Sequence, residues 1–169
     1  MKFIADSMLG GLAKWLRILG YDTLYYSDID DSLLLRIARE EGRTLLTRDT
    51  RLIRVRGLKN FIFIKDDNPE DQLRQLFKSG QIQENREILS RCIHCNSILH
   101  TISSDKAEGT IPDFALWREG DVRQCPSCGK FYWKGTHPEK IRERLKQVFS
   151  CPQDPSERPK KLTSIKDIC

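Results

Sequence analysis

Short apolar segments alternate with helical periodicity along the first 80 residues of the chain. Strands are predicted at residues 2–5, 23–26, 44–47 and 61–64, and helices at residues 9–19, 32–41, 50–55 and 69–78. Gly20 and Gly42 follow two of these helices as C-terminal caps. Because each strand is followed by a helix, the pattern predicts an α/β fold, with a parallel sheet covered by helices on both faces.

The pattern changes after residue 78. Residues 79–87 are polar and contain Gly80, so a linker is predicted there, after a first domain at residues 1–80. A second, smaller module is expected at residues 90–149. Residues 150–169 hold three prolines and few core-forming side chains, which predicts a flexible tail.

Four of the six cysteines form two C-x-x-C pairs separated by 29 residues. The chain has no run of about 20 apolar residues and no export signal, so a soluble cytoplasmic protein without a membrane partner or a disulfide framework is expected. Two C-x-x-C turns aim four sulfurs at one point, which is the tetrahedral arrangement that zinc prefers. We therefore predict a zinc ribbon at residues 90–149, with Cys92, Cys95, Cys125 and Cys128 as ligands of a structural zinc. A redox role for one pair would leave the other pair unexplained.

The net charge of +5 lies mainly in the second half, where residues 91–169 carry 14 basic and 10 acidic side chains. Such an excess fits nucleic acid, although it is also typical of an ordinary solvated surface. Aromatic and basic residues interleave just after the second cysteine pair, so Trp133, Lys134 and His137 are candidate RNA contacts. For Phe131 and Trp133, inward positions in the ribbon core are an equally good interpretation.

Acidic residues follow three of the predicted strands. Asp6 ends the first strand, Asp28, Asp30 and Asp31 lie between the second strand and the helix after it, and Asp49 lies just beyond the third strand. The carboxyl ends of parallel strands share one edge, so these carboxylates are expected to converge there. Their mutual repulsion favours a bound cation, and Mg²⁺ and Mn²⁺ prefer such oxygen ligands. Each acid also has a simpler interpretation as a helix cap, which fits Asp6 least because Ser7 is itself an adequate cap.

Basic and small residues flank this predicted centre. Lys14 and Arg17 lie one turn apart on the helix face opposite the leucines, and Arg48 adjoins the third acid, so all three are candidate phosphate contacts. Ordinary exposed charge explains them equally well. Gly10 and Gly11 are expected to let a substrate backbone approach closely.

Several of these features occur together in one known family. They are Asp6, Leu9-Gly10, Leu12-Ala13, Trp15-Leu16-Arg17, Leu19-Gly20, Asp30-Asp31, Arg43, the segment from Leu45 to Asp49, the two cysteine pairs and the segment from Tyr132 to His137. Across about residues 1–145 the chain resembles the Mut-seven-type C-terminal RNase family. Members look like PIN-like nucleases fused to a zinc ribbon, which implies a metal-dependent ribonuclease. The family's motif acids map to Asp6, Asp31 and Asp49, and a fourth acid is either Asp66 or Asp67.

Three functions are therefore compared. The first is a Mg²⁺- or Mn²⁺-dependent ribonuclease that hydrolyses RNA phosphodiester bonds, in which the three acids hold the metal and the ribbon helps to bind RNA. The second is a non-catalytic RNA-binding adaptor on the same PIN-like fold, which metal-dependent cleavage would exclude. The third is a phosphoryl-accepting receiver domain, to which the appended ribbon gives no support.

Overall fold

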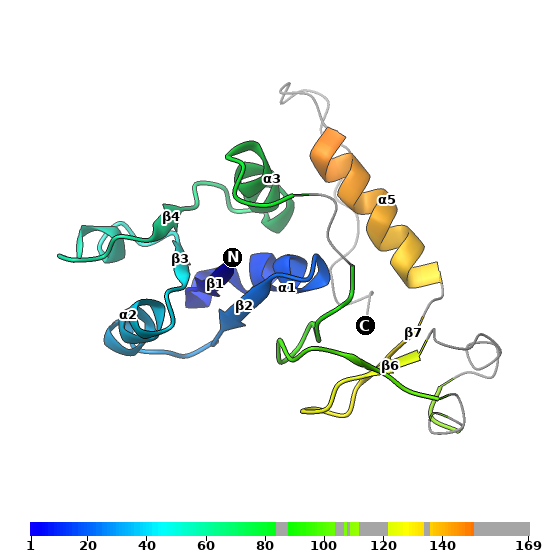
Figure 1. Cartoon of the computed structure of the whole chain (residues 1–169). Coiled ribbons are helices and arrows are strands. Elements are labelled where there is room, and N and C mark those ends of the chain that lie inside the picture. The colour runs from blue at the N-terminus through cyan, green and yellow to red at the C-terminus, as the bar shows by residue number, and fades with distance from the viewer. Residues whose placement is uncertain (84–87, 104–106, 108, 112–121, 134–135, 151–169) are drawn as a thin grey trace.

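A four-stranded parallel sheet forms the centre of the first module (Figure 1). The computed structural model describes residues 1–83, 88–103, 107, 109–111, 122–133 and 136–150. The strands are β1 (Lys2–Ala5), β2 (Asp22–Tyr25), β3 (Thr44–Thr47) and β4 (Phe61–Phe63), arranged in the order β2-β1-β3-β4. Every pairing in this sheet is parallel, so the carboxyl ends of the four strands share one edge.

Helices cover both faces of this sheet. They are α1 (Gly10–Ile18), α2 (Asp31–Glu40) and α3 (Pro69–Lys78), with short 3-10 helices η1 (Ser7–Leu9) and η2 (Leu52–Arg54) after β1 and β3. Phe3 and Ala5 point to the face covered by α1 and α3, whereas Ile4 and Leu45 point to the face covered by α2. Burial on both faces explains why the strands read as apolar runs without polar alternation. The predicted α/β class is confirmed.

The strand order reverses between β1 and β3. The chain leaves β1 toward β2 on one side and leaves β3 toward β4 on the other, so the connections diverge at this point. Open α/β sheets bind ligands outside the carboxyl ends of the strands at such a reversal. Asp6 directly follows β1, and Arg48 and Asp49 directly follow β3, so these residues flank the reversal.

The second module is a small antiparallel sheet joined to two cysteine turns. Its strands are β5 (His100–Thr101), β6 (Val122–Gln124) and β7 (Phe131–Trp133), in the order β5-β6-β7. Phe131 and Trp133 pack with Val122 in a small apolar cluster of this module. Tyr132 lies on the opposite face and packs against the cysteines. Phe131 and Trp133 therefore pack into the core of the ribbon, which is the second of the two interpretations given for them.

The last described helix, α5 (Thr136–Ser150), returns to the first module (Figure 1). Ile141, Leu145 and Val148 join the apolar cluster that also contains α1 and α3. Arg144 pairs with Glu70 of α3, and Phe149 lies 4.3 Å from Phe77 between ring centroids. The helix that follows the ribbon thus helps to cover the first module.

The predicted element boundaries agree closely with the structure where local signals are strong. β1, β3 and α3 have the predicted limits, and β2 begins one residue earlier than predicted. The predicted helix at residues 50–55 is the shorter η2. Within the described residues, no helix has both the length and the apolar character needed to cross a membrane.

The predicted division into domains needs one structural qualification. Ile82 and Ile93, which lie on either side of the predicted linker, are buried in the same apolar cluster as α1. The Leu89 amide also donates to the Ile18 carbonyl at 2.8 Å. The modules at residues 1–80 and 90–149 therefore share a core, while the predicted tail after Ser150 lies outside the described residues.

Candidate functional site

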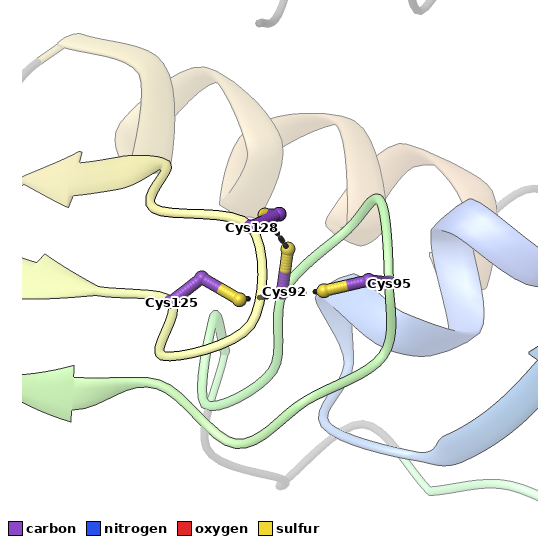
Figure 2. Close-up of side chains that lie close together, drawn as sticks. All are labelled: Cys92, Cys95, Cys125 and Cys128. Atoms are coloured by element: carbon purple, nitrogen blue, oxygen red, sulfur yellow. Dashed lines mark hydrogen bonds between the residues drawn. The ribbon is translucent and has the colours of Figure 1, made fainter.

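Four cysteine sulfurs converge between the two cysteine turns of the second module (Figure 2). The sulfurs lie within 4.8 Å of one another, with Cys92 3.5 Å from Cys128 and Cys95 3.3 Å from Cys125. Four sulfurs at about 2.3 Å from a tetrahedral zinc would be roughly 3.8 Å apart. The arrangement therefore fits one four-coordinate zinc ion, as the spacing of the two pairs predicts.

The two cysteine turns have the same backbone design. In the first, the Asn96 amide donates to the Cys92 carbonyl at 2.9 Å, and in the second the Gly129 amide donates to the Cys125 carbonyl at 3.0 Å. Both residues have left-handed backbone conformations, with φ of 69° at Asn96 and 73° at Gly129. Glycine adopts this conformation freely and asparagine tolerates it better than most residues.

A tyrosine hydroxyl supports the first turn. Tyr132 lies with its hydroxyl oxygen 3.1 Å from the Cys92 sulfur, and that oxygen accepts from the Ile93 amide at 3.2 Å. Burial raises the pKa of Tyr132, and the neighbouring Cys92 raises it further, so the phenol stays protonated. The hydroxyl can therefore donate to a Cys92 thiolate.

The pKa of the Cys95 thiol lies below its ordinary value in the absence of metal. Burial raises its pKa, but hydrogen bonds with the backbone and side chain of Ser97 and with the sulfurs of Cys125 and Cys92 outweigh this effect and lower the pKa to about 6. A thiolate is the form that binds a metal.

Arg17 differs from its predicted role. Arg17 is only 5% exposed, and its Nη1 donates to the carbonyls of Ile93 at 3.0 Å and His94 at 2.7 Å. Its Nε donates to the Thr23 carbonyl at 2.9 Å. The expectation of a solvent-facing phosphate contact is wrong for Arg17, because the ribbon covers the helix face that the leucines leave free.

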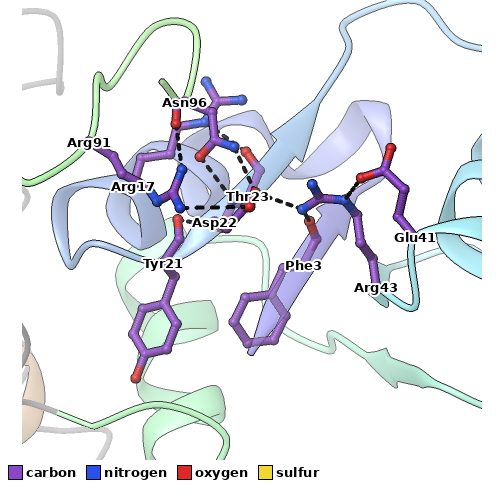
Figure 3. Close-up of polar contacts among 9 residues, drawn as sticks. All are labelled: Phe3, Arg17, Tyr21, Asp22, Thr23, Glu41, Arg43, Arg91 and Asn96. Atoms are coloured by element: carbon purple, nitrogen blue, oxygen red, sulfur yellow. Dashed lines mark hydrogen bonds and ion pairs between the residues drawn. The ribbon is translucent and has the colours of Figure 1, made fainter. Parts of the chain in front are cut away.

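Asp22 joins the same network (Figure 3). Its Oδ1 accepts from Arg43 at 2.7 Å and from the Asn96 side chain at 2.8 Å. Burial raises the pKa of Asp22, but the hydrogen bonds from Arg43 and Asn96 outweigh it and place the pKa below its ordinary value. Sequence reasoning missed Asp22, Arg43 and Asn96 as a group. One usable signal is that Asn96 occupies the position that Gly129 occupies after the second pair.

Asp6 links β1 to the end of β3. Its Oδ1 accepts from the Met8 amide at 2.9 Å, and its Oδ2 accepts from the Arg48 amide at 2.9 Å. The side chain is buried at 5% exposure. Asp6 is thus the N-cap of η1. The expectation that Ser7 would serve as the cap in place of Asp6 is wrong. Its second oxygen holds the backbone of Arg48, the residue that follows β3, close to the end of β1.

Asp49 and Asp31 lie around one arginine. The carboxylate of Asp49 pairs with the Arg51 guanidinium at 2.7 Å and accepts from the Arg51 amide at 2.7 Å. The Arg51 side chain holds the pKa of Asp49 below its ordinary value. Asp31, the exposed first residue of α2, also raises the pKa of Arg51. The carboxylates of Asp6, Asp31 and Asp49 do not all lie within 4.8 Å of one another, unlike the cysteine sulfurs.

Other predicted contacts have varied positions. Arg48 pairs with Asp67, and Asp66 is exposed after β4. Lys14 is half-buried on α1, and together with Lys130 it lowers the pKa of His94, although burial is the larger cause. These positive charges therefore lie near the first cysteine turn. Trp133 is half-buried in the ribbon cluster. Lys134 and the His137 side chain lie outside the described part of the structure.

Gly10 and Gly11 serve packing. A Cβ on Gly10 would lie 2.7 Å from the Tyr25 hydroxyl, and a Cβ on Gly11 would lie 2.5 Å from Pro69. Real Cβ atoms do not approach neighbours so closely. We expected these glycines to let a substrate backbone approach. In the structure they instead let α1 pack closely against Tyr25 of β2 and Pro69 of α3.

Comparison with known families supports the resemblance seen in the sequence. The family described as the Mut7-C RNAse domain matches residues 1–145, which include both the sheet and the cysteine cluster. No curated protein and no solved structure shows significant similarity to the chain. The match indicates a ribonuclease-type function with RNA as the substrate.

Proposed function

The chain belongs to the Mut7-C RNAse domain family, and on this premise we propose that it is a Mg²⁺- or Mn²⁺-dependent ribonuclease. The reaction is hydrolysis of RNA phosphodiester bonds. The proposed catalytic group is Asp6, Asp31 and Asp49.

One observation carries this proposal beyond the family name. Asp6 lies buried where the strand order reverses, and its carboxylate holds the amide of Arg48, the residue before Asp49. This contact brings the ends of β1 and β3 together at the position where open α/β sheets bind ligands.

The donor atoms at this edge suit a hard divalent cation. Asp6, Asp31 and Asp49 supply carboxylate oxygens, which Mg²⁺ and Mn²⁺ prefer. Such a cation, when bound, supplies an activated water and stabilises charge on the leaving oxygen. Asp49 already faces a positive partner, Arg51, whose side chain is 86% exposed and free to move into solvent. Exchange of this guanidinium for a divalent cation would keep a positive charge beside Asp49 and offset one more carboxylate charge.

The chain's own cations have a separate task in this proposal. The Arg48 amide donates to Asp6, and its guanidinium pairs with Asp67 at the same edge of the sheet. From this position the guanidinium can contact a phosphate of the RNA. Arg51, once released from Asp49, gives a second positive group there. Such contacts orient the RNA backbone without reading its bases.

Incubation of the purified protein with labelled structured and unstructured RNA, with and without Mn²⁺, tests this function. We expect cleavage that requires the metal. RNA binding without cleavage under any divalent metal would favour the adaptor, which is also consistent with carboxylates that do not meet within 4.8 Å.

We propose that the cysteine cluster holds one structural zinc per chain. Elemental analysis of protein purified without chelator should find about one zinc, because four thiolates complete the coordination. Protein with no zinc would contradict this assignment.

Tyr132→Phe should weaken zinc binding about ten-fold, because it removes the hydroxyl beside the Cys92 sulfur while keeping the ring that packs on the cysteines. Competition with a chromogenic chelator measures the affinity. Tyr25→Phe is the matched control, since it also removes one hydroxyl hydrogen bond, which Tyr25 donates to the Ser7 carbonyl in the first module. Equal zinc affinity in the wild-type and Tyr132→Phe proteins would show that the hydroxyl does not support the metal.

Lys14→Gln and Lys130→Gln should each weaken RNA binding and reduce its salt slope by about 0.7, the value for one phosphate on a single strand. Both positive charges lie near His94, at the border of the two modules. Binding is measured at several salt concentrations, with Lys78→Gln, an exposed lysine at the end of α3, as control. Point substitutions are needed because deletion of the ribbon would remove Ile93 from the shared core. Unchanged slopes would assign these lysines to an ordinary solvated surface.

A further inference from the structure

The edge strand β2 is covered by polar side chains that belong to the zinc network. Thr23, which is fully buried, donates its amide to Asn96 Oδ1 at 3.0 Å and accepts from Arg17 Nε at 2.9 Å on its carbonyl. β2 is the outer strand beside β1, so its other side would otherwise expose unpaired backbone groups. The side chains of Asn96 and Arg17 satisfy the amide and the carbonyl of Thr23.

Both of these side chains also hold the first cysteine turn. Arg17 donates to the carbonyls of Ile93 and His94, the two residues between Cys92 and Cys95. Asn96 follows Cys95 directly, and its side-chain amide donates to Asp22 at 2.8 Å. The same two residues thus contact the edge of β2 on one side, as Figure 3 shows, and belong to or contact the cysteine turn on the other.

Comparison of the two turns separates the role of the Asn96 side chain from that of its backbone. Both turns require a left-handed residue after the second cysteine, and glycine meets this requirement in the second turn. Asparagine in this conformation is less favourable than glycine. In the first turn, the asparagine side chain makes two hydrogen bonds to β2 that glycine cannot make.

We propose that Arg17 and Asn96 are outer-shell positioning residues of the zinc site, and that they couple zinc binding to the order of β2. Coupling between two sites is reciprocal, so residues through which zinc stabilises β2 must also strengthen zinc binding. The proposal rests on the proposed zinc site and is independent of the ribonuclease activity.

The first test measures zinc release. Asn96→Gly keeps the left-handed turn and removes the contacts with β2, and Arg17→Gln removes the guanidinium. Each variant should transfer zinc to a chromogenic chelator roughly ten-fold faster than the wild type, which corresponds to the lower end of the loss of metal affinity when such hydrogen-bond partners are removed. Arg36→Gln, an exposed arginine on α2, should release zinc at the wild-type rate. Wild-type release rates in both test variants would overturn the proposal, and if Arg17→Gln does not fold, Asn96→Gly decides.

The second test follows amide hydrogen exchange in the wild-type protein with zinc and after chelation, at low temperature. Chelation should increase exchange at β2, above all at Thr23, while β4 at the opposite edge keeps its protection. Unchanged exchange at β2, or an equal increase at β2 and β4, would overturn a local coupling. Elemental analysis of the starting protein separates the two proposals, because absence of zinc contradicts the zinc site itself.

Discussion

Asp49→Asn should reduce Mn²⁺-dependent RNA cleavage by roughly 100-fold or more, because the substitution removes a charged ligand from a centre whose metal contributes several kcal/mol of transition-state stabilisation. The fold should persist. The Asp49 oxygen that accepts from the Arg51 amide can be replaced by the asparagine oxygen, which caps equally well.

Asp6→Asn should lose activity to a similar extent and should also lose stability. Both Asp6 oxygens accept from backbone amides, so the asparagine NH₂ group must face one donor and leave it unsatisfied. Such a loss costs about 1–3 kcal/mol. Asp49→Asn is therefore the cleaner test of catalysis.

Cleavage of a labelled RNA and thermal melts, with and without Mn²⁺, measure these effects. We expect the triple Asp→Asn variant at positions 6, 31 and 49 to have about the same residual activity as each single variant, because one missing ligand already disables the metal site. Glu40→Gln, an exposed acid at the far end of α2, controls for loss of one negative charge. Full activity in the Asp49→Asn protein would exclude it from the catalytic group.

Cys125→Ser should lower the melting temperature of the whole chain by about 10 °C or more. Cys125 is buried beside Leu99 and Tyr132, and the neighbouring turn places Ile93 in the core shared with α1. Loss of several kcal/mol of metal-linked folding energy has an effect of this size in a chain of this length.

The matched control for this experiment is Pro126→Ala, an exposed change in the same turn. Melts are recorded with zinc and with chelator. The wild-type protein in chelator should melt like Cys125→Ser in zinc, since both lack the bound metal. A Cys125→Ser protein that keeps the wild-type melting temperature would show that the cluster does not contribute to folding.

Local sequence signals predict the sheet and the cysteine cluster well. The limits of α3 follow from Asn68 as N-cap, Pro69 at the first position and a buried leucine face, all of which are encoded within a few residues. The cysteine spacing similarly determines a compact turn. In both cases the stabilising contacts are close in sequence, so pattern and structure agree.

The wrong prediction for Arg17 has a different origin. Helical spacing correctly separates Arg17 from the leucines, but two of its carbonyl partners, Ile93 and His94, lie 76 and 77 residues away along the chain. No local pattern reveals such a partner. Because the carboxyl ends of parallel strands share one edge, the strand pattern also places Asp6 and Asp49 near one another. The pairing of Asp49 with Arg51, however, depends on side-chain positions that strand order does not determine.

The packing of α5 on α3 has a consequence for synthesis. Domains fold from the N-terminus as the chain emerges from the ribosome, and transiently exposed apolar surface favours aggregation. Phe77 meets Phe149 only after the cysteine module and α5 have been made. A nascent chain that has completed the parallel sheet still exposes the part of α3, including Phe77, that α5 covers in the finished protein. Premature termination after the sheet should therefore yield an aggregation-prone fragment and not an independent nuclease module.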